Sequence, residues 1–556
     1  MRGVDRIENA ILTAQLALGF ARWWRPLLKA CARPHAQQWV ILQRILRTNS
    51  ASHFGSEHGF ASLRSVAEFQ RRVPWQSYES LRAYIDEQMQ TGRPALTVER
   101  PVMYARTSGT TGAPKLLPVT PAVLNRYRRQ QRMLAAMQVR VAPRAYAGKS
   151  LNIVGAAVEG RTASGLPYGS MSGFVRNTTP SRLQRRDVVP NAVFDIEDYD
   201  RRYQLILILA LAERQITCLG SANPSTFLRL QSMLDSQAET VIRSIASGEL
   251  PPEMDLPLAV RSVVMARLRK DPARAQELTS LAQRGALQLA HVWPDLQLLT
   301  TWTGGQCRVA MERLRPLLPA AMKVLDLGYI ASELRGTLPI AADKTSALPL
   351  IGDHFFEFVE RESWEAGRVE FVTVEQLSDG REYYLFVTTD TLYRYAMDDI
   401  VRVQGFVART PLLEFVQKGR GCTSLVGEKL YESQVIPAMQ GVLKQFGLDC
   451  AFYQLVADEQ AVCYRLYLEV WESTQSMLDA IAMALDQRLA QLNVEYAAKR
   501  DSGRLHRLQV RRLRRGTGEA YVRHCVQAGQ RENQFKQAVL QYARGLRFPF
   551  VDHVED

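Results

Sequence analysis

The chain has 556 residues and a formal net charge of +14. This length exceeds what a single hydrophobic core usually serves, so two or more domains are expected. The composition, with 46% hydrophobic and 23% charged residues, is that of a globular protein and excludes a largely disordered chain. Seven scattered cysteines form no C-x-x-C pair and no Cys/His cluster at zinc spacing, which favours the cytoplasm over secretion.

Helical patterning fills much of residues 1–50. The apolar run from Ala10 to Phe20 is too short to span a bilayer, so no stable membrane insertion is expected. Trp23 and Trp24 lie beside arginines. We interpret the segment as an amphipathic helix that packs onto the domain, with contact to a membrane surface as the weaker alternative.

A loop of small residues follows the β-prone segment Val102–Tyr104. It reads Thr-Ser-Gly-Thr-Thr-Gly-Ala-Pro-Lys over residues 107–115. Such a loop can place backbone N–H groups and hydroxyls around phosphate oxygens. It is not a Walker A motif, because Pro114 precedes the lysine. The sequence therefore predicts a triphosphate site rather than an ordinary polar loop, followed by a helix with Thr120 as N-cap and Pro121 as its first residue.

Two further segments carry chemistry that suits a nucleotide. A Gly-Tyr turn over residues 328–333 follows a predicted strand at Met322–Leu325. Its tyrosine can stack on an adenine and Glu333 can face a magnesium ion, although a surface turn with a solvated glutamate fits equally well. The segment 392–401 contains Asp399, which can accept both hydroxyls of a ribose; the alternative is a strand end with exposed acids.

Strand patterns also appear at Val369–Val374 and Tyr383–Thr388, with Ser378-Asp379-Gly380 as hairpin chemistry between them. Residues 200–245 are mostly helical in pattern. Residues 404–432, with Pro411 and four glycines, have the composition of a connecting region.

Beyond this connecting region the pattern is α+β. It predicts strands near 451–456 and 462–470, a helix over about 474–492, and a last helix near the C-terminus. Arginines alternate with apolar residues over 504–515, which indicates a half-buried strand with a charged solvent face. Nucleic-acid binding ranks last among the functions considered, because no recognition motif accompanies these arginines.

The order and spacing of these segments resemble the acyl-acid amido synthetases, which are the plant auxin-responsive Gretchen Hagen family and its bacterial relatives within the adenylate-forming superfamily. The resemblance runs almost end to end. The matching segments are Phe54-Gly55, His58-Gly59-Phe60, Phe69-Gln70, Val73-Pro74, Tyr78-Glu79, 107–115, 329–333, His354–Phe358, 393–399, Asn493–Tyr496, Arg500, Gly516-Thr517 and Gly529 with Asn533–Lys536.

The resemblance implies an α/β fold with two domains. A large N-terminal adenylate-forming domain with mixed β-sheets would occupy residues 1–403 and bind ATP and the acid. A hinge would follow at 404–420, and a small, mobile α+β domain would occupy 421–556. Rotation of the small domain would separate the two half-reactions.

The implied activity is that of an ATP-dependent ligase that uses Mg²⁺. It would join a carboxylic acid to AMP with release of pyrophosphate, and then pass the acyl group to an amine, typically of an amino acid, to form an amide. Two alternatives stay open. One is an acid–thiol ligase that loads coenzyme A or a carrier protein, and the other is a catalytically degenerate binding protein on the same scaffold.

The resemblance also implies a role for each site residue. Those that would hold the triphosphate are Ser108, Gly109, Thr110, Thr111, Gly112 and Lys115. Those that would contact adenine, the α-phosphate and ribose are Tyr329, Ser332 and Asp399. The magnesium ligands would be Glu333 and Thr111. Lys418, the cation at the hinge, would be among the residues that bind the cofactor. The catalytic residues would be Glu333 and Lys536, and Lys536 would stabilise negative charge as the carboxylate attacks the α-phosphorus.

Three positions depart from the family pattern. Asp398 stands where a glycine usually precedes the ribose aspartate, and Lys418 stands where the hinge usually has an arginine. Gln537 follows Lys536 in place of threonine. The acid pocket is not assigned from sequence; by position its candidate segments are Arg126–Arg129, Leu166–Gly173 and Trp302–Gly305.

Overall fold

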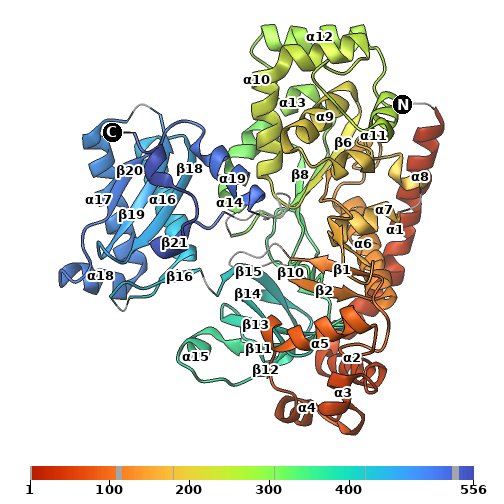
Figure 1. The fold of residues 1–556 in the computed structure, drawn as a ribbon, viewed down its shortest axis with the longest axis vertical. Coiled ribbons are helices and arrows are strands. Elements are labelled where there is room, and N and C mark those ends of the chain that lie inside the picture. Colours follow the sequence, from red (N-terminus) through yellow and green to blue (C-terminus); the bar gives the residue numbers. More distant parts are fainter. Residues whose placement is uncertain are drawn as a thin grey trace. The chain divides into compact units, whose positions relative to one another are not determined.

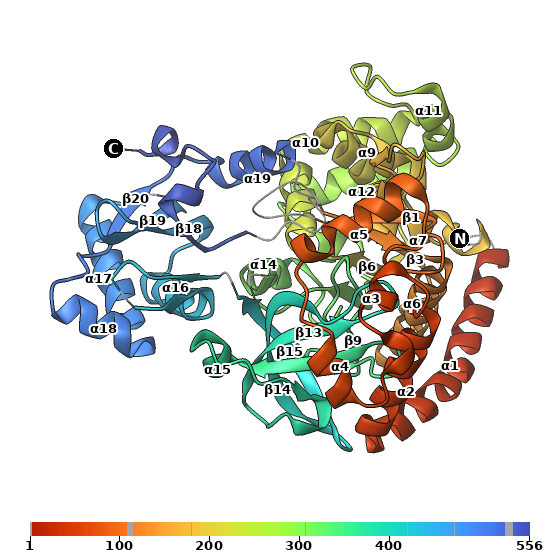
Figure 2. The same cartoon turned by 60° about the horizontal axis from the view of Figure 1, so that its bottom comes forward.

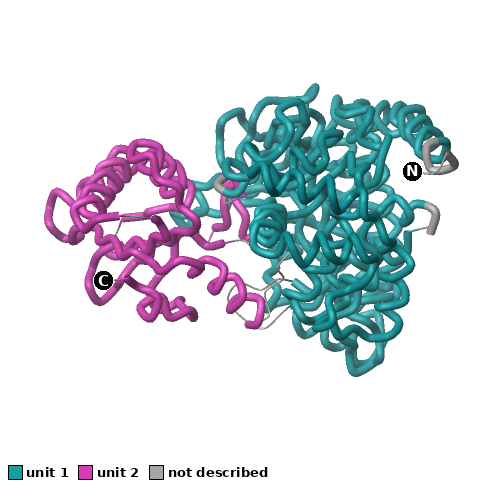
Figure 3. The backbone as a smooth tube through the Cα atoms, turned by 90° about the horizontal axis from the view of Figure 1, so that it is seen from above, with its two compact units in different colours: residues 1–304, 310–397, 401–415 teal, residues 305–309, 398–400, 416–556 magenta. Residues whose placement is uncertain are grey.

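The computed structural model describes residues 3–107, 115–179, 181–305, 307–419, 421–426, 428–471, 473–528 and 537–555. The chain forms two compact units (Figure 3). The first comprises residues 1–304, 310–397 and 401–415, and the second comprises residues 305–309, 398–400 and 416–556. The domain boundaries at residues 403 and 420, which the family resemblance implies, stay a prediction. No helix in the described part of the chain is long and apolar enough to cross a membrane.

The described helices and strands follow in chain order (Figures 1 and 2). The α-helices up to residue 418 are α1 (Gly3–Ala32), α2 (Pro34–Thr48), α3 (His53–Glu57), α4 (Val66–Arg72), α5 (Tyr78–Thr91), α6 (Pro121–Val141), α7 (Met171–Asn177), α8 (Ser181–Gln184), α9 (Tyr199–Ala212), α10 (Ser225–Ser247), α11 (Leu258–Met265), α12 (Pro272–Gln283), α13 (Leu289–Val292), α14 (Cys307–Leu314) and α15 (Arg361–Glu365). The strands are β1 (Met103–Arg106), β2 (Leu116–Val119), β3 (Lys149–Ile153), β4 (Gly160–Arg161), β5 (Pro167–Gly169), β6 (Ile216–Ser221), β7 (Leu298–Thr301), β8 (Lys323–Asp326), β9 (Thr337–Pro339), β10 (Ala347–Pro349), β11 (Phe355–Glu360), β12 (Val372–Thr373), β13 (Glu382–Thr388), β14 (Tyr395–Val407) and β15 (Thr410–Lys418).

Three sheets organise the first unit. Strands β3, β6, β7 and β8 form a parallel sheet, strands β2, β1, β5 and β4 form a small mixed sheet, and seven strands form a sheet in the order β12-β11-β13-β14-β15-β10-β9. One apolar core lies between the parallel sheet and the helices α9, α10, α12 and α13. A second core joins the seven-stranded sheet to α2, α5 and α6. The predicted α/β fold with mixed sheets is confirmed.

Helix α6 forms as its sequence predicts. The Thr120 hydroxyl accepts a hydrogen bond from the Val123 N–H at 3.4 Å, and Pro121 occupies the first turn, where no intrahelical N–H partner is needed. Helix α1 runs beside α6 (Figure 2), with Trp23 and Trp24 packed against the core. This confirms the predicted packing of the N-terminal helix.

The second unit is α+β, as predicted. Its helices are α16 (Glu432–Phe446), α17 (Gln475–Leu492), α18 (Val494–Asp501) and α19 (Thr517–Gln527), and its strands are β16 (Cys422–Thr423), β17 (Leu430–Tyr431), β18 (Cys450–Asp458), β19 (Cys463–Val470), β20 (Gln509–Arg512) and β21 (Leu540–Tyr542). The main sheet has the order β20-β19-β18-β21. In the basic segment Val510 is buried and Arg511 is exposed, so the arginines face solvent and the apolar residues face the core.

Residues 200–245 are mostly helical, as predicted, in α9 and α10, with the short strand β6 between them. One prediction was wrong, because β12 does not pair with β13. Both β12 and β13 pair instead with β11, which lies between them. The turn at Ser378–Gly380 closes against β14, where the Asp379 carboxylate accepts a hydrogen bond from the Gly405 N–H at 2.7 Å. Local turn chemistry therefore gave the right turn and the wrong strand pairing.

Candidate active site

Strands β1 and β2 bring the two ends of the predicted phosphate loop together. They pair antiparallel, with Arg106 opposite Leu116, and the Thr107 N–H donates to the Lys115 carbonyl at 2.9 Å. The Lys115 ammonium lies 5.4 Å from the centre of the Tyr78 ring. The five loop residues of the predicted site, Ser108, Gly109, Thr110, Thr111 and Gly112, lie outside the described residues. Strand β2 between the loop and α6 was absent from the sequence prediction.

The turn after β8 holds Tyr329 in a fixed conformation. Gly328 has φ +71°, and a Cβ there would meet the Thr337 hydroxyl at 2.6 Å, so glycine is required. The Tyr329 N–H donates to the same hydroxyl at 2.7 Å. The ring of Tyr329 is largely buried and stacks beside Phe415, with ring centres 6.3 Å apart. An adenine contact by Tyr329 stays a prediction.

A buried carboxylate that the sequence reasoning missed supports this turn. Asp326, the last residue of β8, accepts hydrogen bonds from the Gly328 N–H at 2.7 Å and from the Thr303 hydroxyl at 2.6 Å. Burial raises the pKa of Asp326. The signal was an aspartate at the carboxyl end of a predicted strand, next to the Trp302–Gly305 segment.

Ser332 connects this turn to β1, the strand that precedes the predicted phosphate loop. Its hydroxyl donates to the carbonyl of Arg106, the last residue of β1, at 3.5 Å. Glu333 follows directly. The structure therefore brings Ser332 and Glu333, which are more than two hundred residues from the phosphate loop in sequence, to the point where that loop begins.

Ser332 and Glu333 also line a small pocket. The other residues that line it are mostly apolar: Leu117, Pro118, Val119, Val123, Tyr127, Met171, Ala331, Leu334, Thr391 and Leu392. Tyr127 and Met171 come from two of the segments that sequence position suggested for the acid. The Trp302–Gly305 segment does not line this pocket and instead supports the turn, because the Trp302 indole donates to the Gly328 carbonyl at 3.1 Å.

Asp399 and Lys418 lie together within the second unit. The Lys418 ammonium contacts the Asp399 carboxylate at 2.9 Å, and the carboxylate is mostly buried. Asp398 has φ +55°, in the left-handed region that favours glycine, which gives a physical reason for the glycine that the family pattern has at this position. The ribose contact of Asp399 stays a prediction.

Lys536, the predicted catalytic lysine, lies outside the described residues. The chain that follows it is anchored, because the Val539 N–H donates to the Glu432 carboxylate at 2.8 Å. Among the described residues no group of three or more His, Cys, Asp and Glu side chains forms a metal cluster. The single predicted carboxylate ligand, Glu333, still fits magnesium, since Mg²⁺ bound with a nucleotide needs only one or two carboxylates beside the phosphates.

Comparisons with known proteins agree with this architecture. The GH3 family N-terminal, central and C-terminal domains match residues 25–322, 347–418 and 433–544. Indole-3-acetic acid-amido synthetase GH3.8 of Oryza sativa subsp. indica is 26% identical over 90% of this chain and 87% of that protein. Indole-3-acetic acid-amido synthetase GH3.4 of Arabidopsis thaliana is 24% identical over 90% and 88%.

Solved structures show the same fold. The GH3.15 acyl acid amido synthetase superposes with a TM-score of 0.84 at 20% identity, over 98% of this chain and 97% of that chain. The structure of AtGH3.15 in complex with 2,4-DB gives 0.85 at 20% identity, over 96% of each chain. The fold is therefore that of the acyl acid amido synthetases.

The GH3 family N-terminal domain alone matches more than half of the residues of this chain, so the chain belongs to the GH3 family. The predicted family is confirmed, and the relatives' names confirm the predicted class of enzyme, an amido synthetase.

Proposed function

We propose that the protein uses ATP to convert a carboxylic acid to its acyl-adenylate and then transfers the acyl group to the amine of an amino acid. The observation that carries this proposal is the Ser332–Arg106 hydrogen bond, which holds the turn with Glu333 at the start of the phosphate loop. The strand that leads into the predicted phosphate loop, the Glu333 carboxylate and an apolar pocket thus belong to one unit. Activation of a carboxylate by ATP needs these three features.

We assign the acid to the pocket between β2, α6 and the turn. Its apolar residues would bury the body of the acid, while Ser332 and Glu333 mark the end at which ATP would react. The relatives named above act on indole-3-acetic acid, and one solved neighbour binds 2,4-DB. We therefore propose acids with a bulky apolar or aromatic body as the first compounds to try.

In the first step an oxygen of the acid's carboxylate attacks the α-phosphorus of ATP, and the bond from that phosphorus to the β-phosphate oxygen breaks. Pyrophosphate leaves and acyl-AMP remains. The phosphate loop and Lys115 would hold the leaving phosphates, and Lys536 would offset charge on the α-phosphate. A magnesium ion held by Glu333 and Thr111 would neutralise phosphate charge.

In the second step the nitrogen of a neutral amine attacks the acyl carbon, AMP leaves with the bonding electron pair, and the nitrogen loses a proton to solvent. No covalent bond to the protein is required. Asp399 would accept the ribose hydroxyls, and Lys418, whose ammonium lies 2.9 Å from that carboxylate, would hold it in position. The seven cysteines carry free thiols, which suits a reducing cytoplasmic location.

The test is ATP–pyrophosphate exchange with a panel of carboxylic acids, followed by product analysis with amino acids and with coenzyme A. We expect exchange with at least one apolar acid and an amide product. A thioester without amide would favour the acid–thiol ligase, and no exchange with any acid would favour a binding protein.

The matched pair Glu333→Gln and Glu239→Gln links the activity to the site. Glu333→Gln is expected to lower exchange by about 100-fold or more, because it removes a charge from the nucleotide site. Glu239, which lies exposed on α10, should tolerate the same change. Equal activity of the two variants would overturn the assignment of Glu333.

A further inference from the structure

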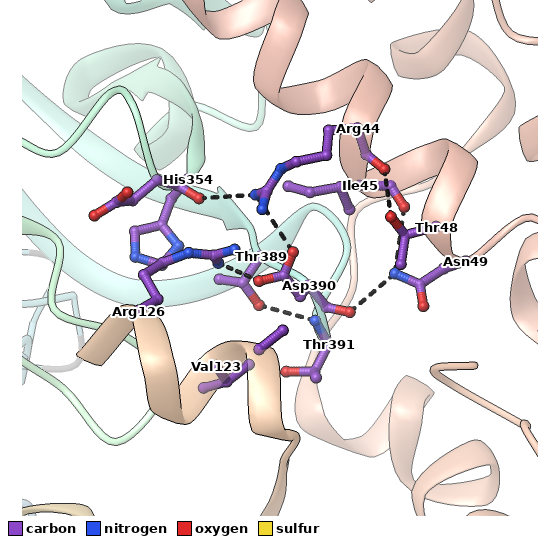
Figure 4. Close-up of polar contacts among 12 residues, drawn as sticks. Arg44, Ile45, Thr48, Asn49, Val123, Arg126, His354, Thr389, Asp390 and Thr391 are labelled. Carbon is purple, nitrogen blue, oxygen red and sulfur yellow. Dashed lines mark hydrogen bonds and ion pairs between the residues drawn. The ribbon is translucent and has the colours of Figure 1, made fainter. Parts of the chain in front are cut away.

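Asp390 is a mostly buried carboxylate in the loop between β13 and β14, and it joins two helices (Figure 4). Arg126 of α6 forms an ion pair with one of its oxygens, and Arg44 of α2 approaches the other at 3.3 Å. The Asn49 amide donates to the Asp390 backbone carbonyl at 3.0 Å. Both the side chain and the backbone of Asp390 are therefore held in place.

The two partners of this ion pair lie next in sequence to residues that line the pocket. Thr391 and Leu392, which follow Asp390 directly, line one wall. Val123 and Tyr127 of α6 line another, and they flank Arg126 at helical spacing. A change in the Asp390–Arg126 distance would thus change the distance between the two walls.

The loop has little freedom to adjust by itself. The Thr389 hydroxyl accepts hydrogen bonds from the backbone N–H groups of Thr391 and Leu392 at 3.2 and 3.1 Å. Its backbone N–H donates to the Leu392 carbonyl at 2.7 Å. This tight turn makes the loop move as one piece with Asp390.

A second carboxylate fixes the same helix one turn further on. Asp353 accepts a hydrogen bond from the Gln130 amide at 2.7 Å and forms an ion pair with Arg129. Helix α6 is thus fixed at two points behind its pocket-facing residues. Of the two, the Asp390 pair is the more enclosed, because the Arg126 side chain is 8% exposed and that of Arg129 is 49% exposed.

We propose that Asp390 is a positioning residue that sets the width of the acid pocket through its ion pair with Arg126, and so determines affinity and size selectivity for the acid. The proposal rests on the function proposed above. Neither residue is assigned a contact with ATP, so the effect should be confined to the acid. A pair that is desolvated and fixed on both sides leaves an uncompensated charge when one partner is removed, which forces the walls to rearrange.

The test compares Asp390→Asn with Asp187→Asn in ATP–pyrophosphate exchange. Asp187 forms a comparable pair with the buried Arg176 at 3.5 Å, and neither of these two residues lines the pocket. We expect Asp390→Asn to raise KM for the acid about tenfold or more and to change the preference between short and long acids, with KM for ATP changed less than about twofold. Asp187→Asn should leave both constants within about twofold of wild type.

An unchanged KM for the acid in Asp390→Asn, or equal rises in both constants, would overturn the proposal. If Asp390→Asn does not fold, Arg126→Lys, which keeps the charge and loses the planar fork, is judged by the same two constants. Calorimetry on wild type without ATP measures acid binding by itself, which separates the proposed function from the positioning role of Asp390. Wild type that shows no exchange with any acid contradicts the proposed function, whereas active wild type with an indifferent Asp390 contradicts only the positioning role.

Discussion

At the scale of single residues, one buried arginine explains several of the segments that matched the family. The Arg394 guanidinium lies 3.0 Å from the Glu357 carboxylate and donates to the backbone carbonyls of Gln70 and Val73 at 2.9 and 2.7 Å. The Gln70 amide donates to Glu357 at 3.0 Å. Three segments far apart in sequence thus meet around one ion pair, so Gln70, Glu357 and Arg394 within them hold the fold together.

Removing one partner of this pair should be costly. Glu357→Gln leaves the Arg394 charge in a fully buried position, so we expect the free energy of unfolding to fall by about 3 kcal/mol or more. Urea denaturation measures it. Glu239→Gln, at an exposed ion pair on α10, should change stability by less than about 0.5 kcal/mol. A loss no larger than that of the control would contradict the structural role.

His354 gives stability a defined pH dependence. Burial, and then the positive charges of Arg126 and Arg44, hold the pKa of its imidazole well below the usual value of about 6.5. The folded protein therefore keeps His354 neutral, while the unfolded chain takes up a proton as the pH falls below about 6.5. This contribution to stability is present above that pH and is lost as the pH falls.

Wild type should therefore lose about 1.4 kcal/mol more stability between pH 7.5 and pH 5.5 than His354→Asn does. Urea denaturation at the two pH values measures the difference. His291→Asn, which removes an exposed imidazole, should keep the wild-type dependence. An identical pH dependence in wild type and His354→Asn would mean that His354 is protonated equally in the folded and unfolded states.

At the scale of elements, sequence predicted what depends on neighbouring residues. The caps of α6 and the apolar face of α17 were sufficient to locate both helices, and alternation located β18, β19 and β20. The pairing of β11 with both β12 and β13 was missed, because strand pairing depends on contacts that no local pattern encodes. The short strand β2 was missed since Pro118 lies within it.

The hairpin between β14 and β15 offers a test of turn chemistry. Ala408 in this turn has φ +54°, a left-handed conformation that costs an alanine roughly 1 kcal/mol, and its side chain is exposed. Ala408→Gly should therefore raise the free energy of unfolding by up to about 1 kcal/mol, after the entropy cost of glycine is subtracted. Gly405→Ala, where φ is +87°, should lower stability in the same urea assay. A less stable Ala408→Gly protein would contradict the assigned backbone strain.

At the scale of the whole molecule, the sequence predicted individual residues of the candidate site but not the contacts that bring them together. The sequence identified Ser332, Glu333, Asp399 and Lys418 as chemical groups. The bond from Ser332 to the end of β1 and the ion pair of Asp390 with α6 arise from tertiary packing between distant segments. Charged residues such as Asp390 had no motif around them, so no sequence pattern distinguished them from solvated surface acids.

The predicted movement of the second unit can be tested at Gly419, where its N–H donates to the Asp398 carbonyl at 2.8 Å. Proline removes this donor and restricts φ, so Gly419→Pro should hinder rotation at the proposed hinge. We expect ATP–pyrophosphate exchange within about threefold of wild type and amide formation lowered about tenfold or more, because only the second step requires the rotated arrangement.

Gly419→Ala keeps the N–H group and serves as the control, with both rates expected near wild type. Single-turnover transfer from preformed acyl-AMP then locates the defect. Slow transfer in Gly419→Pro with normal adenylation supports two arrangements of the units. Equal losses in both half-reactions would mean that the proline disturbs the nucleotide site itself, and an unimpaired Gly419→Pro enzyme would place the pivot elsewhere in the chain or exclude the movement.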